Sequence, residues 1–356
     1  MTQIILAGAG HGHINILKAL ASKPLANTSI TLITNHPRQF YSGMLSAHLE
    51  GIYAEEDISF HVQELCERAQ VRCILATILS IDADDKLITT SQGTFFFDIL
   101  SMNLGSSPKK SFEIDPRRAV YVKPLPEVLR LKRMLEEDDE LKLTPKRMLI
   151  IGAGATGVEL SLALKKSFPK LEITLIEKHQ SLLRNFSKGT TKKVKKRLIE
   201  QVISYSTFES LLAVHEHVIE TTKTWRPYDY LVLSTGFTGP RIAYRGFQVT
   251  EENFILVDQY LRAREKILAM GDMITLKEAP RTPKTGVFAI RQASVLYHNL
   301  RALVEEQPLK PYRPQKNYLQ ILNAGSKNAI LSRGPLTLTG KLPWVIKDAI
   351  DRHYMK

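Results

Sequence analysis

Apolar and polar positions follow the same pattern twice along this chain. Residues 4–10 and residues 148–157 each begin with an uninterrupted apolar run and end in a cluster of glycines. Such a run predicts a buried strand, and the glycines after it predict a tight turn into a helix. A second apolar run follows each turn, at residues 30–34 and 173–177. The chain is therefore predicted to contain two strand-turn-helix-strand units, which build parallel sheets covered by helices.

A third landmark repeats further along. Asp98 precedes Gly105 by seven residues in the first copy, and Asp229 precedes Gly236 by the same seven residues in the second. One glycine fingerprint alone is weak support for nucleotide binding, but three landmarks at similar spacing are hard to ascribe to coincidence. We therefore expect two dinucleotide-binding units.

The remaining segments complete the expected architecture. Short alternating or apolar stretches between residues 71 and 102 predict a small antiparallel meander. The tail, residues 307–356, begins with a Pro-rich stretch, and its pattern predicts two short strands and a final amphipathic helix. Further helices are predicted at residues 14–21, 57–69, 127–137 and 285–305.

We predict an α/β protein with two Rossmann-like domains, the second inserted in the first, and a small C-terminal α+β module. The insertion follows from the breaker cluster at residues 236–240, after which strand-like segments at 254–258 and 267–272 return to the first domain. The expected boundaries are residues 1–117 for the first part of the first domain, 118–238 for the second domain, 239–306 for the return and 307–356 for the C-terminal module.

Composition narrows the class of protein. With 356 residues, 44% of them hydrophobic, and no leader-like or membrane-spanning segment in view, a globular protein of the cytoplasm is expected. Cys66 and Cys73 fit neither a zinc framework nor a redox pair and are interpreted as reduced structural thiols. The net charge of +13 suits anionic cofactors, anionic membrane surfaces or nucleic acid. The densest basic cluster, at residues 188–197, lacks interleaved aromatics, so we expect a solvated helix face and no nucleic-acid partner.

The second copy carries a complete fingerprint. Gly152 makes the turn, Gly154 lets the backbone approach a pyrophosphate, and Gly157 permits close packing of helix on strand. Glu177 ends the next strand, where a carboxylate accepts hydrogen bonds from an adenosine ribose and repels a 2′-phosphate. NADH is therefore expected in preference to NADPH, although the neighbouring Lys178 weakens the preference.

The first copy departs from this pattern. His13 occupies the third glycine position, and Thr34 stands where an acid would meet the ribose. The copy is either a scaffold that binds nothing or a nucleotide site in which Thr34 or Asn35 bonds the ribose, and we favour binding. His11 and His13 flank a glycine in a phosphate turn, so no metal is expected.

Several segments together resemble a known family. Residues 267–272 are similar to the segment by which two-dinucleotide-domain flavoproteins of the pyridine nucleotide-disulfide oxidoreductase family hold FAD. Among such flavoproteins the chain is most similar to type II NADH:quinone oxidoreductases. It resembles still more the NADH-dehydrogenase-like flavoprotein found alone or fused to selenide, water dikinase, through residues 41–45, residues 283–292 and the ending from Trp344 to Arg352. The resemblance runs nearly end to end.

The resemblance implies a role for each copy. FAD would bind the first copy and NADH the second. The implied flavin residues are Gly8, Gly10, His11, His13, Thr34, Asn35, Tyr41, Ser42, Gly43, Met44, Gly105, Gly271, Asp272, Thr285, Gly286, Val287 and Phe288. The NADH residues are Gly152, Gly154, Thr156, Gly157, Glu177, Thr235 and Gly236.

Three residues are expected to support the chemistry. Glu159 would lie beside the nicotinamide, although an acid near a helix start needs no such role. Lys284 would add positive charge near the flavin, unless it is a surface lysine. Gln292 falls in the glutamine pair that type II NADH dehydrogenases carry near the quinone, but Val287 replaces the upstream glutamine, so quinone use is open. Residues 41–45 lack the cysteine pair of the disulfide reductases, so electrons would leave the flavin directly.

These observations predict an FAD enzyme that takes hydride from NADH and delivers electrons to a quinone or another small acceptor. Stacking of the two rings would supply the largest catalytic effect. Two alternatives remain at this stage, a reductase of oxidised sulfur or selenium species and a non-catalytic flavin-based NADH sensor. The C-terminal helix suits a peripheral contact on the inner face of the membrane, packing on the flavin domain, or a homodimer contact.

Overall fold

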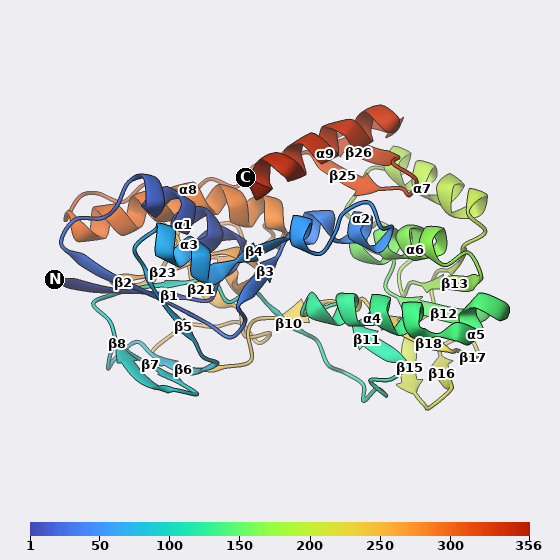
Figure 1. The fold of residues 1–356 in the computed structure, drawn as a ribbon, viewed down its shortest axis with the longest axis horizontal. Coiled ribbons are helices and arrows are strands. Elements are labelled where there is room, and N and C mark those ends of the chain that lie inside the picture. Colours follow the sequence, from blue (N-terminus) through green and yellow to red (C-terminus); the bar gives the residue numbers. More distant parts are fainter. The chain divides into compact units, whose positions relative to one another are not determined.

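The computed structural model describes residues 1–356, which fold into two compact units (Figure 1). Each unit is assembled from three separate stretches of chain. Unit 1 contains residues 1–41, 59–107 and 238–315, and unit 2 contains residues 42–58, 108–237 and 316–356. The chain passes between the units near the short strands β10 (Ser107–Pro108) and β19 (Phe237–Thr238).

Unit 1 is built on a six-stranded sheet in the order β22-β23-β9-β1-β2-β5. All neighbours are parallel except β22 and β23. Helices α1 and α8 pack against each other in this unit (Figure 1). The strands are β1 (Thr2–Ala7), β2 (Thr28–Thr34), β5 (Arg72–Leu75), β9 (Ile99–Met102), β22 (Arg262–Arg264) and β23 (Ile267–Ala269), and the helices are α1 (His11–Ser22), α3 (Val62–Arg68) and α8 (Gly286–Val304).

The return of β23 to the first sheet confirms the predicted insertion. Residues 267–269 pair in parallel with β9, although the whole second glycine unit lies between them in the sequence. Smaller sheets complete unit 1. They comprise β3 (Arg38–Phe40) with β4 (Ser59–His61), β21 (Ile255–Val257) with β24 (Ile274–Leu276), and β20 (Ala243–Arg245) beside β6 (Ile78–Asp82), β7 (Leu87–Thr90) and β8 (Gly93–Phe96).

Two predictions for this unit were wrong. The helix expected over residues 57–69 is split into the 3₁₀ turn η2 (Glu56–Ile58), strand β4 and helix α3, because residues 59–61 pair antiparallel with β3. The antiparallel meander is confined to residues 78–96. Strands β5 and β9 instead pair in parallel with β2 and β1, where both faces of a strand can be buried.

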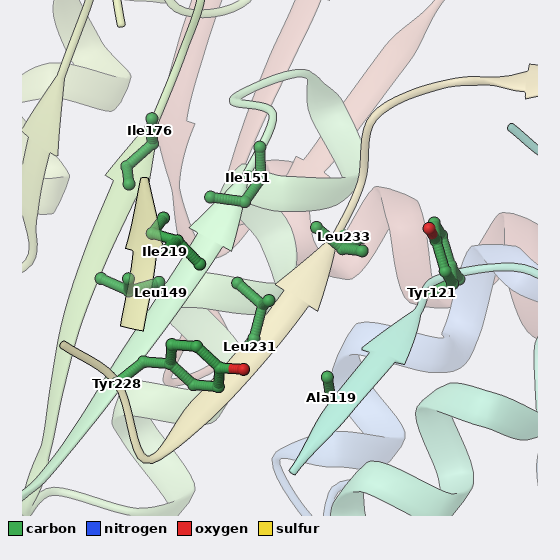
Figure 2. Close-up of a cluster of buried hydrophobic side chains, with 9 residues drawn as sticks. All are labelled: Ala119, Tyr121, Leu149, Ile151, Ile176, Ile219, Tyr228, Leu231 and Leu233. Carbon is green, nitrogen blue, oxygen red and sulfur yellow. The ribbon is translucent and has the colours of Figure 1, made fainter. Parts of the chain in front are cut away.

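Unit 2 contains a five-stranded parallel sheet in the order β11-β18-β12-β13-β14. Alternate residues of β12 and β18, together with Tyr228 and Ile219, form an apolar cluster on one face of this sheet (Figure 2). A hairpin sheet of β15, β16 and β17 contributes Ile219. The elements are β11 (Ala119–Tyr121), β12 (Lys146–Ile151), β13 (Leu171–Ile176), β14 (Ser204–Ser206), β15 (Leu211–Val214), β16 (Val218–Thr221), β17 (Trp225–Pro227), β18 (Tyr230–Leu233), α4 (Pro126–Glu137), α5 (Asp139–Leu143), α6 (Ala155–Ser167) and α7 (Lys188–Glu200).

The tail forms three strands and a helix, where two strands were predicted. They are β25 (Gln320–Asn323), β26 (Ala329–Arg333), β27 (Leu336–Gly340) and α9 (Lys341–Met355). Helix α9 packs on β26, α7 on β26 and β27, and α6 on β25. Residues 316–356 therefore belong to the same compact unit as the second glycine turn.

Two further features of unit 2 concern the predictions directly. The stretch with η1 (Ser42–Met44) and α2 (Leu45–Leu49) was assigned to the first domain, but it lies in unit 2, where α2 packs on α6. The basic residues 188–197 lie on α7, whose Lys192, Lys193 and Lys196 are exposed, which confirms the solvated helix face.

Candidate nucleotide-binding sites in the two units

The first glycine turn requires glycine for reasons of geometry. Gly8 has a φ of 88°, and its N–H donates to Ile33 O of β2 at 2.8 Å. A Cβ atom on Gly8 would lie 2.6 Å from the backbone oxygen of Asn103. Neither the left-handed backbone nor this approach accommodates an L side chain, so the turn is held tightly against the end of β9.

Asn103 is the central polar residue of unit 1, although no motif in the sequence marked it. Its Oδ1 accepts from the N–H groups of Gly12 at 3.0 Å and His13 at 3.3 Å, in the first turn of α1. Its Nδ2 donates to Met270 O at 3.1 Å, next to the predicted flavin segment. One buried amide thus satisfies helix donors that have no partner within the helix and ties β9, α1 and the chain after β23 together.

His13 supports the same turn from inside. Its ring has no exposed surface, Nδ1 lies 2.5 Å from Gly8 O, and Nε2 lies 2.7 Å from Ser101 Oγ. A carbonyl only accepts, so Nδ1 carries the proton and Nε2 accepts from the serine hydroxyl. The ring therefore has no nitrogen left for the cofactor contact that the sequence suggested.

Burial lowers the pKa of His13 to about 4, from an ordinary value of 6.5. The unfolded chain binds this proton below pH 6.5, but the folded chain does so only near pH 4. The contribution of neutral His13 to the free energy of unfolding is therefore fully present above pH 6.5. About 3 kcal/mol of this free energy should be lost as the pH falls from 6.5 to 4. Denaturant unfolding at a series of pH values across this range measures the effect. The free energy of unfolding should depend less steeply on pH in His13→Asn than in the original chain. The control His298→Asn, at an exposed histidine, should keep the full pH dependence of stability. An unchanged pH dependence in His13→Asn would contradict the role given to buried His13.

Gln292 anchors the Asp272 segment through a buried hydrogen bond. It is 3% exposed on α8, and its Oε1 accepts from the N–H of Gly271 at 2.7 Å. Gly271 has a φ of 79° and begins the 3₁₀ turn η3 (Gly271–Met273) that presents the half-exposed Asp272. Val287 and Ser294, on the same helix, are exposed.

A small depression in unit 1 brings several predicted residues together. It is lined by Gly271, Lys284, Thr285, Phe288 and Gln292, among others. Lys284 donates to Ile274 O and to Thr275 Oγ1, and it lies 4.0 Å from the centre of the Phe254 ring. Burial lowers the pKa of Lys284 to about 8. It is therefore a held cation rather than a free surface lysine.

The other predicted flavin residues are distributed between the units. In unit 1, Thr34 is buried and Asn35 exposed at the end of β2, and the His11 and Tyr41 rings lie 5.5 Å apart. Residues 42–44 belong to unit 2.

The second glycine turn, in unit 2, has the geometry of the first without its internal cap. Gly152 has a φ of 100°, and a Cβ on it would lie 2.3 Å from Ser234 O. A Cβ on Gly157 would lie 2.0 Å from Gly152 O, which explains the close packing of α6 on β12. A Cβ on Gly154 would meet nothing within 4 Å, and the first turn of α6 has no side-chain cap. The surface in front of this helix N-terminus is therefore open.

Glu177 is held against this turn at the end of β13. Its Oε2 accepts from the N–H of Ala153 and its Oε1 from the N–H of His179, both at 2.9 Å. Across the turn, Thr235 is half-buried, and Gly236, with a φ of 98°, faces open space. The structure thus brings the predicted glycines, the acid and the end of β18 to one edge of the sheet.

Glu159 belongs to a polar network that no pattern in the sequence indicated. Its Oε1 accepts from the backbone N–H of Asn323 at 2.7 Å and lies 3.4 Å from Ser46 Oγ. Burial raises the pKa of Glu159. Asn323 also donates through Nδ2 to Glu50 Oε1 at 2.6 Å. The network joins α6 to the stretch 42–58 and to the tail.

A buried ion pair on α9 lies in the same part of unit 2. Lys347 Nζ is 2.5 Å from Asp351 Oδ2 and also donates to Gly43 O. Both charges of the pair act electrostatically on Glu159. The positive charge of Lys347 lowers the pKa of Glu159 and so opposes the effect of burial. In the sequence, this ion pair was indicated only by the resemblance of the C-terminal segment around Trp344 to the family described above.

Comparison with protein families decides the classification. The model of the pyridine nucleotide-disulphide oxidoreductase family matches residues 2–293. The chain belongs to this family. Membership agrees with the two glycine turns and with the return of β23 to the first sheet.

Individual relatives of this oxidoreductase are distant but nearly full-length. It is 22% identical to the type II NADH:quinone oxidoreductase of Staphylococcus epidermidis, over 98% of this chain and 94% of the relative. Among solved structures, the sulfide:quinone oxidoreductase of Aquifex aeolicus has a TM-score of 0.83 at 19% identity, covering 99% of this chain and 90% of that one. The NDH2 of Plasmodium falciparum in complex with NADH has a TM-score of 0.81 at 15% identity, covering 99% and 96%. The two structures establish the shared fold.

The helices of this family member are not of the kind that spans a bilayer. None combines the length and the apolar character that crossing a membrane would require.

Proposed function

We propose that the chain is a flavin-dependent NADH dehydrogenase that holds FAD at the first glycine turn and NADH at the second, and passes electrons to a quinone or another small acceptor. The observation that carries the proposal is the pair of glycine turns within one family fold, the second of them completed by the fixed carboxylate of Glu177. The named relatives that act on NADH and quinone support it.

The residues of unit 1 fit a flavin dinucleotide. Gly105, with a φ of 73°, faces open space beyond β9, and α8 begins without a side-chain cap. Asp272 is half-exposed on η3, held there through Gly271 and Gln292. An uncapped helix N-terminus and the Lys284 ammonium both favour negative charge on a group bound beside them.

The residues of unit 2 fit a nicotinamide dinucleotide. The open N-terminus of α6 offers backbone N–H groups to a pyrophosphate, and Gly154 lets that group approach. Glu177 presents its carboxylate at the strand end where a ribose would lie. Bound FAD would supply the redox chemistry, by accepting a hydride from the nicotinamide and giving electrons to the acceptor. The chain itself binds, orients and provides charge.

A visible spectrum of the purified protein, followed by anaerobic titration with NADH, tests this function. We expect a flavin spectrum that bleaches with one equivalent of NADH, and steady-state NADH oxidation with a quinone. Protein that takes up no FAD, or a bound flavin that NADH does not reduce, would overturn the proposal. Turnover with polysulfide or selenite but not quinone would replace the acceptor, and bleaching without turnover would indicate a sensor.

We further propose a peripheral membrane contact through the tail. Exposed apolar side chains on β27 and α9 share this region with the exposed Lys341 and Arg333, a combination that suits an anionic bilayer surface. The apolar residues are Leu336, Leu338, Leu342, Val345 and Ile350.

The double variant Leu342→Glu/Val345→Glu is expected to lower binding to anionic liposomes by roughly tenfold or more, because it removes apolar area and adds repulsive charge. Co-sedimentation measures this. Phe96→Glu, at an equally exposed apolar residue of unit 1, should leave binding unchanged. Loss of a dimer in size-exclusion chromatography, without any loss of liposome binding, would assign the surface to a second copy of the chain instead.

A further inference from the structure

The loop after Glu177 is built as a rigid part of the second nucleotide site. Leu183 adopts a left-handed conformation, with a φ of 51°, and is 2% exposed. Its N–H donates to Ala153 O in the glycine turn at 3.0 Å, and Phe186 N–H donates back to Leu183 O at 2.8 Å. A non-glycine residue in this conformation is held there by its surroundings. The loop is therefore fixed against the turn.

This fixed loop places two positively charged side chains, Lys178 and Arg184, around the end of β13. Lys178 is exposed directly after Glu177, and Arg184 is exposed directly after the buried Leu183. Arg184 Nη1 lies 3.3 Å from His179 Nε2, so the guanidinium reaches back across the loop to within two residues of Glu177. Arginine is suited to phosphate because its planar donor groups match phosphate oxygens.

Glu177, the acid at this strand end, repels a nearby phosphate less than an isolated carboxylate would. Both oxygens of Glu177 already accept backbone N–H groups, one from the glycine turn and one from the loop. These donors stabilise the negative charge and fix the carboxylate against the turn. Its repulsion of a neighbouring phosphate is therefore opposed by two amide dipoles and by the cations of the loop.

We propose that this strand end accepts NADPH as well as NADH, with Arg184 and Lys178 receiving the adenosine 2′-phosphate. The inference rests on the proposed function, because that function assigns a nicotinamide dinucleotide to the second glycine turn. An acid at the strand end is ordinarily associated with NADH, and a nearby arginine with the 2′-phosphate of NADPH. This chain carries both.

Isothermal titration of the FAD-loaded protein with two adenosine nucleotides tests the inference without turnover. The pair is 5′-AMP and adenosine 2′,5′-bisphosphate, which differ only in the 2′-phosphate. We expect the bisphosphate to bind at least as tightly as 5′-AMP. Arg184→Ala and Lys178→Ala should each lower the ratio of the two affinities by roughly tenfold, through loss of a charge-assisted contact. The control Lys192→Ala, an equal charge change on α7, should leave the ratio unchanged.

Two outcomes would overturn the inference while leaving the proposed function intact. One is bisphosphate binding that is roughly a hundredfold weaker than 5′-AMP binding. The other is an affinity ratio that Arg184→Ala does not change. Anaerobic reduction of the flavin by NADPH, compared with NADH, gives an independent readout. If neither nucleotide binds and neither donor reduces the flavin, the proposed function itself fails.

Discussion

Asn103→Leu is expected to lower the free energy of unfolding of unit 1 by about 3 kcal/mol or more, and to release bound flavin. Leucine has a similar volume but cannot accept from the buried N–H groups of Gly12 and His13 or donate to Met270 O. Each buried polar group left without a partner costs about 1–3 kcal/mol. The loss falls on three segments at once, because this amide is the contact they share.

Denaturant unfolding and flavin content after purification measure this effect. Asn103→Asp separates the two parts of this effect, because its carboxylate still accepts from both helix amides but cannot donate to Met270 O. Its free energy of unfolding and its flavin content should fall between those of the original chain and those of the leucine variant. A leucine variant as stable as the original chain would show that the amide is dispensable and that the turn is held by glycine packing alone.

Lys347→Met is expected to destabilise unit 2 by about 3–5 kcal/mol, because it leaves the Asp351 carboxylate buried without its partner. It also removes the donor to Gly43 O, through which α9 holds the stretch 42–58. Replacing both charges, in Lys347→Met/Asp351→Leu, should recover much of the loss, since two apolar side chains need no desolvated partner.

Fluorescence of Trp344 reports this unfolding locally in a Trp225→Phe background. Trp344 is buried on α9 and its ring lies 6.4 Å from that of Tyr53, so detachment of the helix should change its emission. Lys142→Met, which breaks an exposed pair with Asp139, should have no measurable effect. If the double variant is as unstable as the single one, the ion pair itself contributes stability that two apolar side chains cannot replace.

Local patterns predicted the elements of both glycine units. The apolar runs at the two turns became β1 and β12, and the helices expected at 127–137 and 285–305 were observed as α4 and α8. Prediction failed where strand pairing outweighed local pattern. Residues 59–61 continue a helical pattern, yet they pair with β3, which comes some twenty residues earlier in the chain.

The candidate site divides in the same way. The glycines and Glu177 were readable, because a left-handed turn, a close backbone approach and a strand-end carboxylate each leave a local mark in the sequence. The roles of Asn103 and Gln292 were not, since a polar residue beside an apolar segment does not reveal which distant backbone group it will meet.

The sequence by itself determined that this protein has two nucleotide-type turns, an inserted second unit and no cysteine pair in the stretch 41–45. Only the tertiary structure decided which polar groups hold those turns in place. Asn103 meets Gly12, which lies 91 positions earlier, and Glu159 meets Asn323, which lies 164 positions later. The physical reason is that backbone conformation is set by neighbouring residues, whereas a buried hydrogen bond is made by whatever the fold brings within about 3 Å.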